Sequence, residues 1–181
     1  METDLDTIRT LARERESENF AFVAFLKACI DSRVDAVVGE VQREVSAAID
    51  CRQCANCCRR VRPVFDLEDL VRFSAGISQS PDRFKERYFV PGKDRLLFKA
   101  PPCPFLSGNL CANYAHRPKT CSAYPHLHEA DFSYRLTAVI DHLSICPIIF
   151  NVFERLKGLG RGLSAGVRPS QLPPFASLYL R

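Results

Sequence analysis

The chain has 181 residues and a mass of 20.4 kDa, which suits one compact domain with an appended helical arm. A hydrophobic fraction of 46% is enough for a core, so the nine cysteines are not needed to replace one. The formal charge of +4 comes from basic residues spread along the sequence, and this spread does not predict nucleic-acid binding.

The N-terminal segment alternates in charge and does not resemble a signal peptide. The apolar run from Phe20 to Leu26 is too short to cross a bilayer, so we expect a cytoplasmic protein without a membrane partner. In reducing cytosol, the cysteines are better interpreted as metal ligands than as disulfides, which remain the alternative if the protein is exported. Four thiolates around a divalent metal carry two net negative charges, so two such sites would cancel the formal charge of the chain.

Residues 1–50 are predicted to be helical, and we expect two helices. Either Asp31 or Ser32 can cap a helix, which places a break between the two. The second helix has an apolar stripe with the period of one buried face. We expect this stripe to pack in the core, with an unknown protein partner on the N-terminal helices as the alternative. The stripe consists of Ile30, Val34, Val37, Val38, Val41, Val45, Ala48 and Ile49.

Between residues 61 and 99, residues typical of helix starts and ends predict short helices and strands. Acidic residues in a first turn and a following glycine indicate one helix, and a serine followed by proline indicates another. The predicted elements, in chain order, are an extended segment 61–65, a helix from Asp66 to Gly76, a helix capped by Ser80 with Pro81 at its first position and ending near Tyr88, and a strand over 95–99.

Residues 100–125 are dense in Pro, Cys, Gly and Asn, which predicts a loop-rich region that a metal must hold in place. Residues 133–141 alternate between apolar and polar side chains, which predicts a strand. Cys146 and the following proline begin a final helix over 148–156, and the tail from Gly158 is predicted to be flexible.

The predicted fold class is α+β, with N-terminal helices and a small metal-centred, loop-rich domain that contains short helices and a few antiparallel strands. The predicted segments are 1–50 (helical), 51–157 (cysteine-cluster domain) and 158–181 (tail).

Three cysteines, Cys51, Cys54 and Cys57, follow one another at the spacing of metal ligands. Two residues between cysteines let a tight turn direct both thiolates, and nearby backbone N–H groups, to one centre. The run resembles that of bacterial ferredoxins, which a remote Cys-Pro pair completes. This chain has two such pairs, Cys103-Pro104 and Cys146-Pro147. The pattern predicts a metal centre.

Cys58 directly follows Cys57, and adjacent side chains point apart in regular backbone. The two thiols therefore serve two centres, or one of them is a spare or redox-active thiol. Cys29 is interpreted as a buried free thiol of the early helices. The eight cysteines that remain are the number that two tetrathiolate sites require. One cluster with several additional thiols is the competing interpretation.

Other side chains give little indication of chemistry. The four histidines are interpreted as surface residues or as neighbours of the ligands: His116, His126, His128 and His142. The sequence contains no phosphate-binding glycine loop, no GxSxG and no HExxH. A Cys–His nucleophilic pair stays open, and the sequence does not decide whether the protein is an enzyme.

The motifs CRQCANCC (51–58), PCPFLSGNLC (102–111) and YAHRPKTCSAYP (114–125), with the late Cys146, resemble the YkgJ-type CxxCxxCC cysteine-cluster family. The resemblance covers roughly residues 50–150 and implies a zinc- or iron-chelating domain. The ligand set that it implies is Cys51, Cys54, Cys57, Cys58, Cys103, Cys111, Cys121 and Cys146. The positions implied to shape the metal loop are Tyr114, Arg117, Pro118, Tyr124 and Pro125, and departures from the family pattern occur at Asn113 and Ser122.

The leading prediction is a metal-binding protein that holds an iron–sulfur cluster, [4Fe–4S], with a redox or supporting role. The preference for iron rests on the ferredoxin-like run. One alternative is a structural zinc module that presents its N-terminal helices to a partner. The other is a protein methyltransferase, because the same motif is similar to part of flagellin lysine N-methylase.

Overall fold

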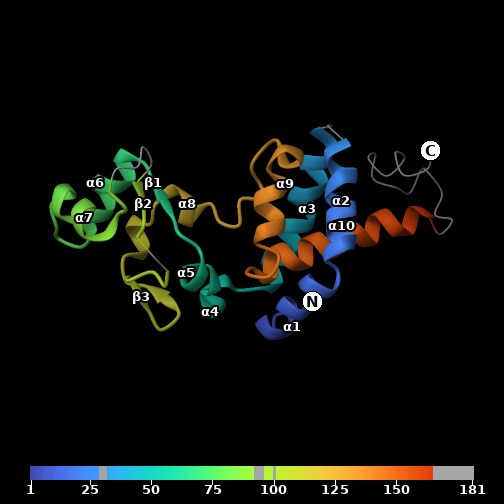
Figure 1. The fold of residues 1–181 in the computed structure, drawn as a ribbon, viewed down its shortest axis with the longest axis horizontal. Helices are drawn as coiled ribbons and strands as arrows, with labels where there is room; N and C mark the ends of the chain where they lie inside the picture. Colours follow the sequence, from blue (N-terminus) through green and yellow to red (C-terminus); the bar gives the residue numbers. More distant parts are fainter. Residues whose placement is uncertain (29–31, 92–95, 100, 165–181) are drawn as a thin grey trace. The chain divides into compact units, whose positions relative to one another are not determined.

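The computed structural model describes residues 1–28, 32–91, 96–99 and 101–164. The chain divides into two compact units: unit 1 combines Met1–Asp50 with the residues from Pro125 onwards, and unit 2 is Cys51–Tyr124. Helices predominate, and a few short antiparallel strands form two small sheets (Figure 1). The predicted α+β class is confirmed.

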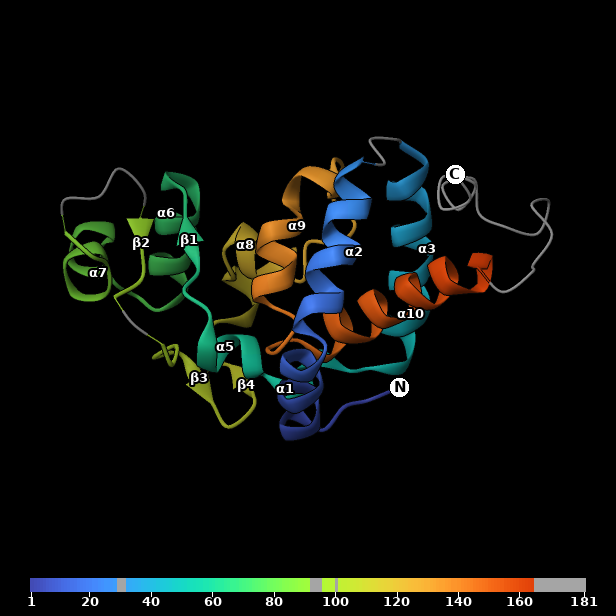
Figure 2. The ribbon, with the colours of Figure 1, turned by 45° about the vertical axis from the view of Figure 1, so that its right-hand side comes forward.

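Unit 1 is built from helices. In its described part these are α1 (Leu5–Glu14), α2 (Glu16–Ala28), α3 (Ser32–Ala48), α9 (Phe132–Asp141) and α10 (Pro147–Ser164). Helix α2 packs on α9, and α10 packs on α3; Figures 1 and 2 both show α2 and α9 side by side. Residues 125–157, which the sequence analysis assigns to the cysteine domain, thus contribute α9 and α10 to unit 1, and α10 continues past Gly158.

The described residues among the first fifty are mostly helical, as predicted, and they form three helices rather than two. The Asp4 side chain accepts a hydrogen bond from the N–H of Thr7 and caps α1, in which Ile8 is fully buried. Helix α2 ends at Ala28 and α3 begins at Ser32, which agrees with the predicted break.

The predicted apolar stripe forms the buried face of α3. Its buried members are Val34, Val38, Val41, Val45 and Ile49. Val37 is half-buried and Ala48 is exposed, so the edges of the stripe reach solvent. Ile30, like the predicted buried thiol of Cys29, lies outside the described residues.

Residues 133–141 belong to helix α9, so the predicted strand is wrong. The prediction followed the alternation of apolar residues, but the same residues also fit a helical period. Phe132, Leu136 and Val139 are buried at spacings of three and four, whereas Tyr134, which the alternation placed with Leu136, is 68% exposed. Spacings of three and four place side chains on one face of a helix, and this face packs in unit 1.

Polar contacts also join helices in the described part of unit 1. Asp35 of α3 accepts a hydrogen bond at 3.0 Å from the N–H of Phe132, which satisfies a donor at the start of α9. Lys157 of α10 is buried, and its Nζ donates to Asn19 Oδ1 at 2.8 Å and pairs with Glu154 at 2.5 Å. The buried ammonium group thus has both a counter-charge and a hydrogen-bond acceptor.

Unit 2 consists of short elements joined by loops. They are α4 (Cys51–Cys54), α5 (Asn56–Arg60), β1 (Val64–Phe65), α6 (Leu67–Gly76), α7 (Pro81–Tyr88), β2 (Leu96–Leu97), β3 (Leu106–Ser107), β4 (Leu110–Cys111), the 3₁₀ helix η1 (Tyr114–His116) and α8 (Lys119–Ser122). Strand β1 pairs antiparallel with β2, and β3 and β4 form a hairpin in which Leu106 faces Cys111.

Local capping signals place α6 and α7 where the sequence predicts them. Asp66 and Asp69 form a reciprocal capping box at the start of α6, which ends at Gly76. Ser80 caps α7, and Pro81 occupies its first turn. The predicted strand over 95–99 is present as β2 and a bridge from Phe98 to Phe89, with residue 95 outside the described part.

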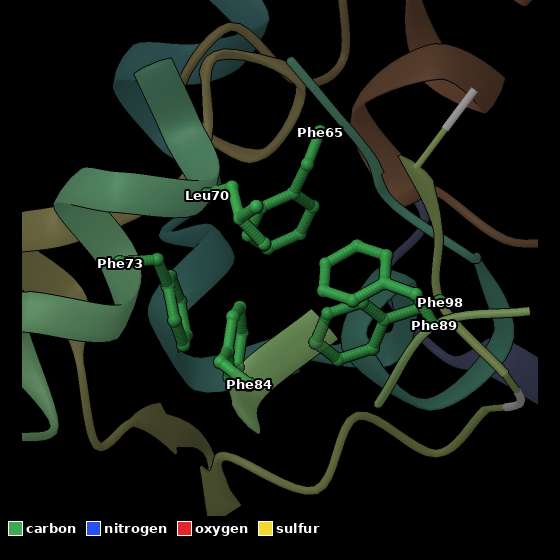
Figure 3. Packing of buried hydrophobic residues seen from close by; sticks show 6 residues of the cluster. All are labelled: Phe65, Leu70, Phe73, Phe84, Phe89 and Phe98. Carbon is green, nitrogen blue, oxygen red and sulfur yellow. The ribbon is translucent and has the colours of Figure 1, made fainter. Parts of the chain in front are cut away.

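An aromatic core joins the β1–β2 sheet of unit 2 to helices α6 and α7. Figure 3 shows its buried side chains turned toward one another: Phe65, Leu70, Phe73, Phe84, Phe89 and Phe98. The rings of Phe65 and Phe98 stack with centroids 5.1 Å apart, and those of Phe73 and Phe84 with centroids 5.3 Å apart. Phe105 packs edge-on against Phe73 at 4.9 Å, which ties the following loop to this core.

In the part of the chain that the structure describes, no helix combines the length and the apolar character needed to cross a membrane.

Replacing Gly76 with Ala is expected to destabilise unit 2. A Cβ at Gly76 would lie 2.4 Å from Asn113 Oδ1 and 2.5 Å from His116 Nδ1. Asn113 cannot move away without losing the hydrogen bond from its Nδ2 to the carbonyl of Phe73. We expect the free energy of unfolding to fall by about 1–3 kcal/mol, as over-packing typically costs, measured by urea unfolding with far-UV circular dichroism.

Gly39→Ala is the matched control, because nothing lies within 4 Å of a Cβ at Gly39 in α3. Alanine favours a helix interior over glycine, so this variant is expected to gain about 0.5–1 kcal/mol. A Gly76→Ala variant as stable as the wild type would contradict the close packing of α6 against η1.

Candidate metal centre

Four of the eight predicted ligands line one small cavity in unit 2: Cys58, Cys103, Cys111 and Cys121. The cavity has a volume of about 40 Å³. The other residues that line it are Pro63, Phe65, Phe73, Phe98, Phe105, Leu106, Arg117 and Pro118. Thiols from four separate chain segments therefore face a space whose walls are otherwise mostly apolar.

Backbone pairing brings the first three of these cysteines together. The N–H of Cys103 donates to the carbonyl of Cys58 at 2.8 Å, which joins the CxxCxxCC motif directly to the remote Cys-Pro loop. The N–H of Leu106 donates to the carbonyl of Cys103 at 3.1 Å and closes a turn. Leu106 then pairs with Cys111 across the β3–β4 hairpin, so one continuous ladder connects Cys58, Cys103 and Cys111.

Backbone N–H groups also point at two of the sulfur atoms. Those of Phe105 and Leu106 donate to the Cys103 side chain, and that of Asn113 donates to the Cys111 side chain; these bonds oppose the larger rise in pKa that burial causes at both thiols. Hydrogen bonds of this kind favour the thiolate over the thiol. They are also the outer contacts that tune sulfur ligands in metal sites.

A polar clamp attaches the hairpin to the CxxC segment. The Arg59 guanidinium donates to the carbonyl of Cys54 at 2.8 Å and to that of Gly108, in the hairpin turn, at 3.0 Å. Asn109 Nδ2 donates to the carbonyl of Gln53 at 2.7 Å. These bonds satisfy carbonyl groups at the end of the four-residue helix α4, which has too few residues to satisfy them itself.

A buried carboxylate fixes the segment that carries the fourth cysteine. Asp69 Oδ1 accepts hydrogen bonds from the N–H of Lys119 at 3.0 Å and from Arg72 Nη2 at 2.6 Å. Pro118 provides no side-chain cap for α8, so Asp69 of α6 caps this short helix from a distance. Arg72 also donates to the carbonyl of Arg117 at 2.8 Å. Asp69 is one of the acidic residues in the first turn of α6, and its long-range contact with α8 has no signal in the sequence.

Asn113, one of the departures from the family pattern, has a defined role in the structure. Its side chain is buried, with Nδ2 donating to the carbonyl of Phe73 at 2.8 Å and Oδ1 lying 3.0 Å from His116 Nδ1. The amide thus links the C-terminal part of α6 to η1 and fixes the loop that follows Cys111. An apolar side chain at this position could not make these bonds.

The four thiols differ in their ease of ionisation. A hydrogen bond from the Cys57 side chain, helped by the charges of Arg59 and Arg117, lowers the pKa of Cys58 to about 7. Burial raises the pKa of Cys103 to about 11 and that of Cys121 to about 12, and the neighbouring cysteines add to the rise. Burial also raises the pKa of Cys111. The contact between Cys57 and Cys58 differs from the expected divergence of adjacent side chains.

The other four predicted ligands do not line this cavity. Cys51 is exposed, and Cys54 and Cys57 are half-buried, all three within α4 and α5. Cys146 is buried in unit 1, directly before α10. Of the histidines, His126 lies 2.6 Å from a carboxylate oxygen of Glu129 rather than at a cysteine.

The donor set fits a sulfur-bound metal group. Thiolates select zinc, copper(I) and iron–sulfur clusters over hard cations such as magnesium. Among the described residues, no three His, Cys, Asp or Glu side chains converge closely enough to hold a single ion. The four cysteines instead surround a cavity with apolar walls, a geometry that accepts a group with several sulfur attachment points.

These features define a cysteine-rich metal-binding domain. Residues 50–141, a little more than half of the chain, match the model of the CxxCxxCC family, described as a "putative zinc- or iron-chelating domain". The chain belongs to this family, which confirms the resemblance found in its sequence. No curated protein and no solved structure matches the chain.

In metal-free, reduced protein, iodoacetamide is expected to alkylate Cys58 before Cys103 and Cys121. The thiolate is the reacting form, and a pKa of about 7 makes about half of Cys58 thiolate at neutral pH, whereas Cys121, with a pKa of about 12, stays protonated. The rate at Cys58 should rise about tenfold from pH 6 to pH 8. Tandem mass spectrometry of tryptic peptides measures the order, and equal rates at Cys58 and Cys121 would contradict it.

Replacing Asp69 with Asn is expected to lower the free energy of unfolding by about 2–3 kcal/mol, because buried donors lose a charged acceptor. The same variant should release metal faster to a chelator, since the segment carrying Cys121 loses its anchor. Asp82→Asn is the control: Asp82 is exposed in the first turn of α7, and its loss should cost a few tenths of a kcal/mol. Equal stability of the two variants would show that Asp69 does not anchor α8.

Proposed function

We propose that this protein binds a [4Fe–4S] cluster through Cys58, Cys103, Cys111 and Cys121 and acts in electron transfer or supports a redox reaction. The observation that carries the proposal is that four thiols surround a cavity rather than converge on a point. A tetrahedral zinc site needs four sulfurs at about 2.3 Å from one ion. In a [4Fe–4S] cluster each cysteine binds its own iron, so the sulfurs enclose a volume.

The surroundings of the thiols support the same proposal. Phe65, Phe73 and Phe98 are buried and form part of the apolar wall of the cavity. Backbone N–H groups aimed at Cys103 and Cys111 stabilise negative charge on sulfur. Low solvent exposure and N–H contacts to sulfur are two of the factors that set the potential of iron–sulfur clusters.

When bound, the cluster supplies a site that accepts and releases one electron. The residues of this chain hold it, limit its contact with water and tune its charge. Of the four cavity cysteines, Cys58 has the thiol that is most easily ionised and is therefore the first of them available to an incoming metal. Cys103 and Cys121 give up their protons only as metal replaces them, so assembly of the centre should release protons.

Cys51, Cys54, Cys57 and Cys146 remain in the proposed ligand set on the strength of their sequence motif. The iron content distinguishes the two interpretations of the eight cysteines. About four iron and four sulfide per chain correspond to one [4Fe–4S] centre, and about twice that amount corresponds to two.

Protein purified without oxygen is expected to be brown and to contain iron and acid-labile sulfide in equal amounts. Replacing Cys121 with Ser should remove the visible absorption of the cavity centre, because one of its four ligands is lost. Ser122→Ala, an exposed neighbour in the same helix α8, is the control and should keep the full iron content. A colourless wild-type protein with stoichiometric zinc and no sulfide would overturn the iron–sulfur proposal.

A further inference from the structure

Arg117 lines the cavity but is not one of the proposed metal ligands, so its role there is still to be explained. Among the described residues that line the cavity, it has the only charged side chain apart from the cysteines. Arg117 lies four residues before Cys121, and the cavity it lines also contains Cys58 and Cys111. A guanidinium group stays protonated in proteins, so this position carries a fixed positive charge next to the thiols.

The position of this guanidinium group is built into the fold. It lies over the Tyr114 ring, 3.5 Å from the centroid, and its Nε donates to the carbonyl of Tyr114 at 3.0 Å. The carbonyl of Arg117 itself accepts a hydrogen bond from Arg72, which is paired with the buried Asp69. Both the backbone and the side chain of Arg117 are therefore held in place.

No carboxylate of the described residues neutralises the positive charge of Arg117. In the described ranges, no Asp or Glu forms an ion pair with it, and its contacts are to a ring and to a carbonyl. Arg72 of unit 2, by contrast, is paired with the carboxylate of Asp69. Arg117 is half-buried at the edge of the cavity, and toward the apolar walls its charge is screened less than it is toward solvent.

We propose that Arg117 is the charge-compensating residue of the cysteine centre and raises its reduction potential. The proposal rests on the [4Fe–4S] function proposed above. Four thiolates and the oxidised core carry two net negative charges, and reduction by one electron makes that three. A fixed positive charge stabilises the more negative state more strongly, so it favours the reduced form. The step adds one electron from a chemical reductant, and it neither forms nor breaks a bond.

The test is a redox titration with dithionite of the anaerobically purified protein and three variants, followed by visible absorption. Arg117→Gln removes the charge but retains hydrogen-bond donors, and Arg117→Lys retains the charge. At a fixed poise, Arg117→Gln should lower the ratio of reduced to oxidised cluster at least tenfold, a downward shift of about 59 mV for a one-electron couple. Arg117→Lys should stay within a third of that shift.

Arg87→Gln is the matched control. Arg87 is exposed on α7 and lies over the Tyr88 ring at 5.3 Å, but it does not line the cavity. Its loss should leave the potential unchanged, which separates a local charge effect from a change in overall charge. A purely structural role for Arg117 would make the glutamine and lysine variants lose cluster together without a specific shift in potential, and this result would overturn the proposal.

The two proposals fail in distinguishable ways. A wild-type protein without iron and sulfide overturns the iron–sulfur function and, with it, the role of Arg117. A wild-type protein with an intact cluster and an unchanged potential in Arg117→Gln overturns the role of Arg117 alone. If Arg117→Gln does not retain the cluster but Arg117→Lys retains it at the wild-type potential, the requirement for positive charge is supported.

Discussion

The cost of ionising buried thiols that share one cavity is the constraint on which the centre of unit 2 depends. Four sulfur atoms face a cavity with mostly apolar walls, so burial disfavours each thiolate, and each ionised thiol makes ionisation of the others more costly. Without a cation, the deeper thiols of Cys103 and Cys121 therefore hold their protons. A bound metal group replaces those protons and supplies the missing positive charge, so metal binding, proton release and ordering of the surrounding loops are coupled.

Side-chain hydrogen bonds hold the loops around the cysteines, whose backbone groups are not all paired within helices or sheets. Arg59 fastens the hairpin, Asp69 caps the helix that carries Cys121, and Asn113 fastens the loop after Cys111. Each contact satisfies backbone groups that a short element cannot satisfy by itself. Arg72, which is paired with Asp69, donates to the carbonyl of Arg117 and holds this residue at the cavity wall. Unit 2 thus supports its centre with hydrogen bonds as much as with its aromatic core.

The parts of this structure that local chemistry determines were predictable from sequence. Helices α6 and α7 begin at Asp66 and Ser80 because the capping residues act within one turn. Helix α9 was mistaken for a strand because ten residues with apolar side chains at several spacings fit both periods, and only packing decides between them. Spacing predicted the cysteines to be metal ligands, but it did not show which of them share a cavity. Contacts between distant segments, such as the bond from the Cys103 N–H to the Cys58 carbonyl, place Cys58 rather than Cys57 at the cavity.

The central claim is that the cavity holds a cluster whose metal atoms are bound by different cysteines. X-ray absorption at the iron and zinc edges of anaerobically purified protein tests it most directly, because the technique reports the neighbours of each metal. We expect iron surrounded by sulfur with a second shell of iron atoms, and loss of this second shell in Cys121→Ser. Zinc with a single shell of four sulfurs at about 2.3 Å, and no iron, would contradict it.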